Sequence, residues 1–177
     1  MRFGLGPMTC EVVDGWRSAG LPTGVGVETK QVDIYEEVLE WATTAEWWGF
    51  DSVWVDERHF TPDSFNTSSS VIAAALSQRT EYVRVGMMPV LGLVNAMYVA
   101  EEASCIDNIN SGRTVVAGQV PDDETVRGWS GSGASNSVAR IVDDIAVLRK
   151  SWGPNPFSHH SEYHTIPMCS DVHVEAA

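Results

Sequence analysis

The stretch GFDSVWVDERHF, residues 49–60, combines a short apolar strand with a run of ionisable side chains directly after it. Residues 53–55 are the apolar centre, and Gly49 before them fits the position just past a helix, where a positive φ is required. Residues 56–59 are Asp, Glu, Arg and His, and Phe60 follows them. The run is therefore either the solvated end of a strand or the floor of a functional site.

Apolar periodicity on both sides of this stretch predicts alternating strands and helices. We expect strands at residues 2–8, 52–55, 82–88 and 113–117, and helices at residues 32–48, 69–78, 94–109 and 138–152. Asn66 or a nearby Ser would cap the second of these helices. Gly-rich segments predict loops at residues 14–30 and 118–136, and residues 159–166 predict a hairpin.

Strands this short that alternate with helices indicate parallel βαβ units and an α/β fold. Four such units suit the first half of a TIM barrel, and they also suit a small doubly wound sheet. The apolar centre of residues 113–117 is typical of a strand covered on both faces. The pattern of residues leaves both architectures open.

Composition excludes several classes of protein. The net charge of −13 over 177 residues argues against nucleic-acid binding, and no apolar run is long enough to predict a membrane span. Cys10, Cys105 and Cys169 are scattered and odd in number, which argues against a disulfide framework and for a reducing, cytoplasmic compartment. Each is expected to be a small buried or edge residue.

In both parallel architectures the chemistry lies at the carboxyl ends of the strands. The loop 14–30 and residues 56–60, 89–91 and 118–120 should therefore gather on one rim. His59 is the best titratable candidate there, because imidazole exchanges a proton near neutral pH. Asp56 and Glu57 could orient it, and Arg58 could hold an anion; the alternative is a solvated strand end in which His59 makes a structural hydrogen bond.

Other motifs are weaker, and no metal site is predicted. His159, His160 and His164 resemble a metal-binding tract, but a solvated hairpin is favoured. GWSGS, residues 128–132, lacks the final Gly of a nucleophile elbow, and residues 24–29 lack the third Gly of a dinucleotide fingerprint. The seven Trp residues are expected mostly in the core or at the rim, where one could flank a flat cofactor.

The order of several segments resembles that of the bacterial luciferase-like flavin monooxygenases. The segments are MRFGL (1–5), AEWWGFDSVWVDERHF (45–60), AAALSQRTEYVRVGMMPVL (73–91), NAMYVAEEASCIDNINSGR (95–113), VVAGQ (115–119), the helix VARIVDDIAVLRKSW and SEYHTI (161–166). The resemblance implies a TIM-barrel type of fold, represented by about its first four (β/α) units in a domain of residues 1–167, with an unpatterned tail at 168–177.

The resemblance also implies reduced FMN as the cofactor, or F420 as in some branches, and the oxidation of a small organic substrate with molecular oxygen. Carried over by position, Met87, Met88 and Pro89 would face the flavin ring, and Gln119 and Val120 would approach the flavin from the fourth strand. The catalytic residues implied are His59, Arg58 and Glu57, which follow the second strand.

The chain departs from the family pattern in three places. Arg58 stands where luciferase-type members have the first of two consecutive His, and Pro121 stands where they have a phosphate-binding Arg. By this resemblance, the second half of the barrel would be missing from this sequence. The alternative is thus a truncated or vestigial half-barrel without turnover, a self-associating or flavin-binding module. Two unpaired strand edges and the Ala-rich helix segment 71–76 favour a homo-oligomer.

Overall fold

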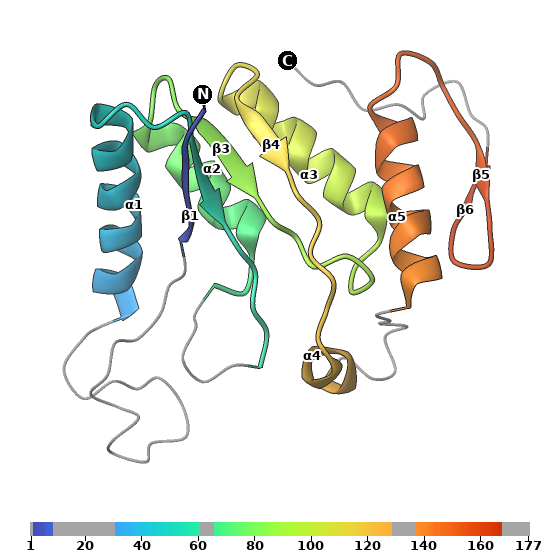
Figure 1. Ribbon diagram of the computed structural model, residues 1–177. Helices are drawn as coiled ribbons and strands as arrows, with labels where there is room; N and C mark the ends of the chain where they lie inside the picture. The colour runs from blue at the N-terminus through green and yellow to red at the C-terminus, as the bar shows by residue number, and fades with distance from the viewer. Residues whose placement is uncertain (1, 9–30, 61–65, 129–136, 168–177) are drawn as a thin grey trace. The chain divides into compact units, whose positions relative to one another are not determined.

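The computed structural model describes residues 2–8, 31–60, 66–128 and 137–167 (Figure 1). These residues belong to two compact units, Met1–Pro89 with Arg113–Ala117, and Val90–Gly112 with Gly118–Ala177. The expected loop at residues 14–30, the incomplete fingerprint within it and the tail at residues 168–177 lie outside the described residues.

The first unit contains a sheet of four parallel strands. The strands are β1 (Gly4–Met8), β2 (Ser52–Val55), β3 (Arg84–Met87) and β4 (Thr114–Val116), and they lie in the order β1-β2-β3-β4. Val53 is in register with Leu5 on one side and Val85 on the other. This order confirms the four predicted strands and their parallel arrangement, because each strand pairs with the next one along the chain.

Helices α1 (Gln31–Trp47) and α2 (Ser69–Arg79) pack on this sheet (Figure 1). Side chains of β2 alternate in burial, with Val53 and Val55 fully buried and Trp54 between them half-buried. Complete burial of an apolar side chain contributes roughly 1.5–3 kcal/mol. The alternating pattern of β2 therefore fixes which face the helices cover.

The ends of both helices follow from local sequence signals. Gly49 has φ +81 after α1, as predicted, and the Phe50 N–H donates to the Ala45 carbonyl at 3.0 Å. Ser68 caps α2 by accepting a hydrogen bond from the Val71 N–H, so the expected Ser cap is confirmed. These caps place β2 and the residues after it between two rigid helices.

Two charged side chains hold the turn between α2 and β3. The Arg113 guanidinium donates to the carbonyls of Ser77 (3.2 Å), Thr80 (2.9 Å) and Val83 (2.6 Å). From the end of α1, the Glu46 carboxylate accepts hydrogen bonds from the N–H groups of residues 81–83. Burial alone would raise the pKa of Glu46, but these backbone donors and Arg113 lower it below its ordinary value.

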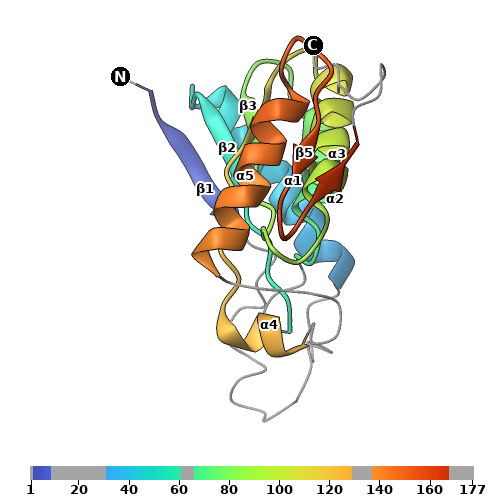
Figure 2. The same cartoon turned by 90° about the vertical axis from the view of Figure 1, so that its right-hand side faces the viewer.

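The second unit contains helices α3 (Ala96–Ile109), α4 (Asp123–Gly128) and α5 (Val138–Ser151), and a hairpin of β5 (His159–His160) and β6 (Thr165–Ile166). Helices α3 and α5 pack against each other, and the Trp152 indole N–H lies 3.3 Å from the Ala100 carbonyl and 3.1 Å from Ser104 Oγ. Figure 2 shows the hairpin beside α5. The predicted helices and hairpin of this unit are confirmed.

Three expectations were wrong. The segment 118–136 is not loop throughout, because it contains α4, where the Thr125 N–H donates to Asp122 Oδ1 at 2.7 Å. Strand β4 is half-buried at all three residues, since it is the outer strand in the sheet order. Four residues that were expected in the core, at the rim or at an edge are exposed: Trp41, Trp47, Trp48 and Cys105.

Candidate functional site

The carboxyl ends of β2, β3 and β4 lie at one edge of the sheet. The Met88 N–H donates to the Val55 carbonyl at 2.9 Å, and the Ala117 N–H donates to the Met87 carbonyl at 3.0 Å. Residues 56–60, 88–89 and 117 form what we call the strand-end rim. The expected gathering of residues 56–60 with residue 89 is therefore confirmed within the first unit.

In the second unit the segments that follow β3 and β4 also lie side by side. Val90 and Gln119 form an isolated parallel bridge, and the Leu91 N–H donates to the Gln119 carbonyl at 2.9 Å. Gln119 is half-buried, whereas Val120 is 61% exposed. The two residues expected to approach a flavin from the fourth strand thus differ in how much surface they present.

A hydrogen-bonded pair with little exposed surface, Glu57 and His59, forms the first part of the rim. His59 Nε2 lies 3.0 Å from Glu57 Oε1, and the two side chains are only 12% and 14% exposed. The other carboxylate oxygen, Glu57 Oε2, accepts hydrogen bonds from Ser69 N–H (3.1 Å) and Ser69 Oγ–H (2.9 Å) at the start of α2. The helix start therefore anchors Glu57, and Glu57 orients the His59 ring.

The electrostatics of this pair favour an ionised carboxylate. Burial alone would raise the pKa of Glu57, but the hydrogen bonds from His59 and Ser69 lower it below its ordinary value. An ionised carboxylate that contacts one ring nitrogen determines which nitrogen carries the proton. The pair can thus present a histidine with a defined tautomer at the strand-end rim.

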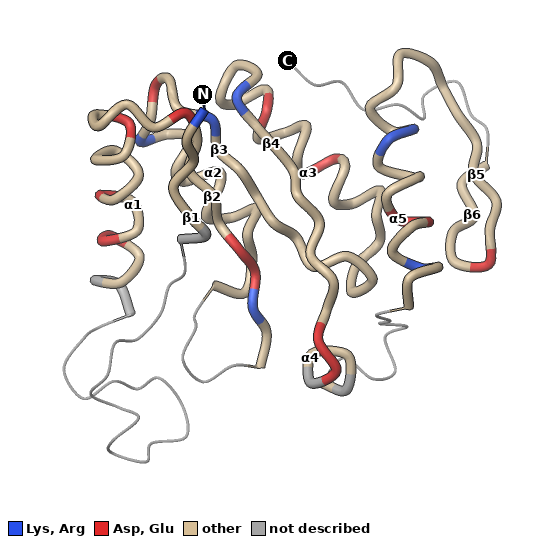
Figure 3. Tube along the Cα trace, in the orientation of Figure 1, with Lys and Arg blue, Asp and Glu red and all other residues tan. Residues whose placement is uncertain are grey.

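A second ion pair alternates with the first along the chain. Arg58 Nε lies 3.0 Å from Asp56 Oδ2, with Asp56 5% exposed and Arg58 41% exposed. Asn66 holds the same turn, since its side-chain N–H donates to the Asp56 main-chain carbonyl and its main-chain carbonyl accepts from the Arg58 N–H at 2.8 Å. Figure 3 shows this charged stretch in red and blue just past β2. Arg58 is the most exposed of the four ionisable groups of the rim.

These contacts exclude a solvated strand end for most of the run. Asp56 is buried, and Glu57 and His59 are nearly so, although each carries an ionisable group. The run ends at Phe60, whose φ of +57 is unusual for a residue other than glycine. Backbone outliers of this kind occur often at functional sites. The catalytic role of His59, Arg58 and Glu57 stays a prediction that rests on this geometry and on the family resemblance.

The residues at the end of β3 and directly after it fit the ring of a flavin only in part. Met87 is fully buried and Pro89 is buried, so the half-buried Met88 is the member of this trio with side-chain surface left for a flat ligand. The polarisable thioether of Met makes favourable contacts with aromatic rings. The chemistry of Met88 therefore fits an isoalloxazine ring, and the cationic Arg58 on the same rim fits a group with negative charge.

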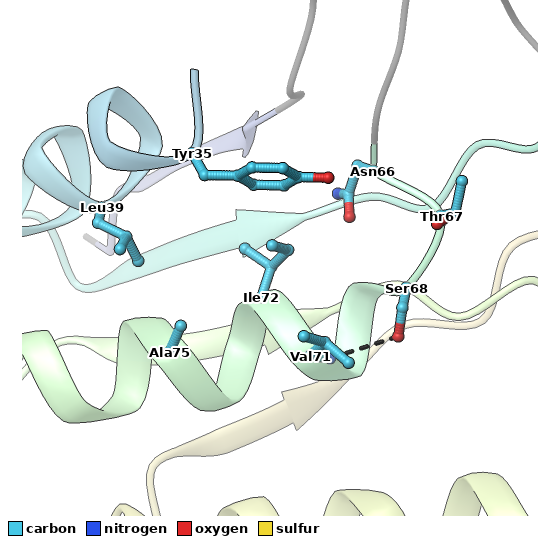
Figure 4. Close-up of a pocket in the computed structure, with 8 residues that line it drawn as sticks. All are labelled: Tyr35, Leu39, Asn66, Thr67, Ser68, Val71, Ile72 and Ala75. Atoms are coloured by element: carbon cyan, nitrogen blue, oxygen red, sulfur yellow. Dashed lines mark hydrogen bonds between the residues drawn. The ribbon is translucent and has the colours of Figure 1, made fainter. Parts of the chain in front are cut away.

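A cavity that the sequence did not predict lies beside the rim (Figure 4). It has a volume of about 430 Å³. Its lining residues come from α1, from the segment before α2 and from the first turns of α2: Tyr35, Leu39, Asn66, Thr67, Ser68, Val71, Ile72 and Ala75. The one available signal was the polar segment 66–68, which predicted a helix cap but not a cavity wall.

The buried histidines of the tract do not fit the solvated hairpin that the sequence favoured. His159 Nε2 lies 2.8 Å from Asp143 Oδ1, and His164 Nε2 lies 2.5 Å from Asp144 Oδ1, with both His buried and only His160 exposed. Burial alone would raise the pKa of Asp143, but hydrogen bonds from Ser161 and His159 lower it. Among the described residues no group of three His, Cys, Asp or Glu is arranged to hold a metal ion. The two pairs fasten the hairpin to α5.

Two other features of the sequence are the GWSGS segment and the absence of an apolar spanning run. Most of the GWSGS segment lies outside the described ranges, which end at residue 128 and resume at residue 137. Within the described ranges, no helix combines the length and apolarity that a membrane span requires.

The sequence is similar to known flavin enzymes. It is 24% identical over 151 residues to the oxygenase component of a flavin-dependent trigonelline monooxygenase of Acinetobacter baylyi. The matched region covers 84% of this chain and 42% of that relative. The chain thus spans less than half the length of this curated relative.

The fold is similar to those of two solved monooxygenases. The structure of RslO1 from Streptomyces bottropensis matches with a TM-score of 0.79 and 20% identity over 99% of this chain and 50% of that one. The oxygenating constituent of 3,6-diketocamphane monooxygenase from Pseudomonas putida, solved with FMN, matches with a TM-score of 0.73 and 15% identity over 93% of this chain and 43% of that one. The architecture is thus that of luciferase-like TIM-barrel monooxygenases, and a doubly wound sheet is set aside.

The family assignment rests on the extent of the sequence match. The model of the family described as luciferase-like monooxygenase matches residues 14–175, which is most of the chain. The parallel strand order and the Glu57–His59 pair after β2 are the structural setting of the segments that resemble the family. This chain belongs to the luciferase-like monooxygenase family.

Proposed function

We propose that this chain acts as a flavin-dependent monooxygenase that uses reduced FMN and molecular oxygen to oxidise a small organic substrate. The observation that carries the proposal is the Glu57–His59 pair, which is largely shielded from solvent at the carboxyl end of β2 and anchored by Ser69. A hydrogen-bonded carboxylate and imidazole form an arrangement suited to proton transfer. Family membership and the flavin dependence of the curated relative support the choice of cofactor.

In this proposal His59 handles protons and Glu57 positions it. An ionised Glu57 bound at Nε2 favours the tautomer with its proton on Nε2, so Nδ1 becomes the basic ring nitrogen. Ser69 keeps Glu57 in place through two hydrogen bonds, and Glu57 in turn keeps the imidazole ring of His59 oriented during turnover. His59 is therefore the proposed general base or acid, and Glu57 and Ser69 are positioning residues.

Two other rim residues would contact the cofactor or substrate. Met88 would lie against the flavin ring, and Arg58 would compensate negative charge that develops near the rim. Gln119 and Val120, in the second unit, are carried over from the family resemblance as further cofactor-binding residues. Bound reduced flavin would supply two electrons and two protons, so that one oxygen atom of O₂ enters the substrate and the other leaves as water.

The test follows the oxidation of reduced FMN by O₂, which needs no knowledge of the substrate. In a stopped-flow instrument, the chain is mixed with reduced FMN under anaerobic conditions and then with oxygenated buffer at several pH values. We expect the chain to change the rate from that of free flavin, and His59→Ala to change the pH profile of that rate. His160→Ala is the matched control, because His160 is exposed on the hairpin and outside the rim.

The outcomes separate the proposal from its alternatives. A His59→Ala profile identical to that of the wild type would remove His59 from the mechanism. Binding of FMN with an unchanged oxidation rate would instead support a flavin-binding module without turnover, which the exposed Arg58 at the position of the family's first His favours. Binding of F420 without binding of FMN would assign the chain to the F420-using branch.

A further inference from the structure

We infer that the cavity between α1 and α2 binds a neutral aromatic molecule of one or two rings that carries a single hydroxyl group. This cavity is separate from the proposed proton-transfer pair, and the inference does not depend on flavin chemistry. It rests on the volume of the cavity, on the chemistry of its lining and on the placement of its polar side chains (Figure 4).

The volume sets the size of the ligand. Binding pockets for small molecules have volumes of about 300–1,000 Å³, and an apolar cavity of about 150 Å³ is enough to hold benzene. At about 430 Å³, the cavity is large enough for a two-ring compound but is near the lower limit for a cofactor. A compound of one or two rings would therefore fill most of it.

The lining sets the charge of the ligand. None of the lining residues that the structure describes is charged, although the chain as a whole has a net charge of −13. Leu39, Val71, Ile72 and Ala75 form apolar walls, so an ionised ligand would lose part of its hydration there without gaining a charged partner among the described lining residues. The cavity thus favours a neutral compound over a carboxylate or a phosphate.

The polar side chains lie together at one end. Figure 4 shows the Tyr35 hydroxyl directed toward Asn66, with Thr67 and Ser68 on the same side of the cavity. Hydroxyl and amide groups of this kind can donate to and accept from a ligand hydroxyl. A ligand with one hydroxyl at one end and apolar rings elsewhere would match this division.

The location links the cavity to the rim without making it part of the rim. Asn66 lines the cavity and also bonds the backbone of Asp56 and Arg58. Ser68 lines the cavity as well, and it precedes the Ser69 that anchors Glu57. A bound ligand would therefore contact the segment that supports both ion pairs of the rim.

The test uses the full chain and measures binding by isothermal titration calorimetry at pH 7, with three probes. These are 2-naphthol, naphthalene-2-carboxylate and naphthalene, which share the ring system but differ in one substituent. We expect 2-naphthol to bind at least about tenfold more tightly than the carboxylate, because an unpaired charge is costly in an apolar cavity. Equal binding of the carboxylate, or no binding of 2-naphthol by the folded chain, would overturn the inference.

A pair of matched variants locates the site. Ala75→Leu adds bulk to the cavity wall, whereas Ala74→Leu makes the same change at a neighbouring half-buried position that does not line it. We expect Ala75→Leu to weaken 2-naphthol binding at least about tenfold, which corresponds to about 1.4 kcal/mol, and Ala74→Leu to change it less than about twofold. Equal effects of the two changes would overturn the assignment to this cavity.

A second variant keeps the test decisive if Ala75→Leu does not fold. Tyr35→Phe removes only the hydroxyl and leaves the ring in the cavity wall. We expect it to remove most of the preference for 2-naphthol over naphthalene, while naphthalene binds as it does to the wild type. A preference unchanged by Tyr35→Phe would contradict the proposed polar end.

Discussion

Replacing Gly86 by Ala tests how the sheet accommodates Trp54. Gly86 is in register with Trp54 on the neighbouring strand, and a Cβ atom there would clash with indole atoms Cε3 and Cδ2 and lie 2.8 Å from Cζ3. The indole has little freedom to move away, since its N–H donates to Ser52 Oγ at 2.9 Å. Overpacking of this kind costs roughly 1–3 kcal/mol. For a chain of this size each kcal/mol lowers Tm by about 2–4 °C.

The assay is urea and thermal unfolding of a double-mutant cycle, followed by circular dichroism. We expect Gly86→Ala to lower the unfolding free energy by about 1–3 kcal/mol in the wild-type background. In a Trp54→Leu background the same change should cost less than about 0.5 kcal/mol, because the clashing ring is gone. An equal cost in both backgrounds would refute the reasoning, as would a Gly86→Ala variant as stable as the wild type.

Three further predictions concern stability and assembly. Arg113→Lys should lower the unfolding free energy measured in urea by about 1–3 kcal/mol, because an ammonium group replaces a guanidinium that holds three carbonyls of the α2–β3 turn. The control is Arg84→Lys at an exposed position, which should change the unfolding free energy by less than about 0.5 kcal/mol. Because the pKa of Glu57 is lowered, its ionised carboxylate stabilises the fold fully above the ordinary pKa of 4.5, and this contribution is lost as the pH falls through the lowered pKa. Glu57→Gln should therefore flatten the loss of stability that the wild type shows between pH 4.5 and the lowered pKa, as urea unfolding at several pH values would show. The outer strands β1 and β4 should promote self-association, and a stable monomer in light scattering would contradict this.

Periodicity predicted those elements whose signals are local. Strand β2 and helix α2 begin at the predicted residues because each has a clear signal, an apolar run in one case and a Ser cap in the other. Helix α4 was missed because Gly, Ser and acidic residues surround it. Its one local signal is Asp122, which accepts from the Thr125 N–H as a capping residue does.

The site was predictable in its residues but not in its contacts. Functional residues lie at the carboxyl ends of parallel strands, and this rule predicted Glu57 and His59 at the rim. Nothing local in the sequence indicates that Ser69, twelve residues after Glu57, anchors the Glu57 carboxylate. The partners of His159 and His164 were missed for the same reason, since Asp143 and Asp144 lie on α5, a separate element. Contacts between distant segments depend on tertiary packing, which periodicity does not encode.

The central claim is that this chain uses reduced flavin, and anaerobic calorimetric titration with reduced FMN tests it most directly. We expect saturable binding to the wild type, similar binding to His160→Ala, and weaker binding to a Met88→Ala variant, because Met88 would lie against the ring. His59→Ala should bind nearly as well as the wild type, since His59 is proposed to act on protons rather than to hold the cofactor. A folded wild-type chain that binds neither reduced FMN nor reduced F420 would contradict the account.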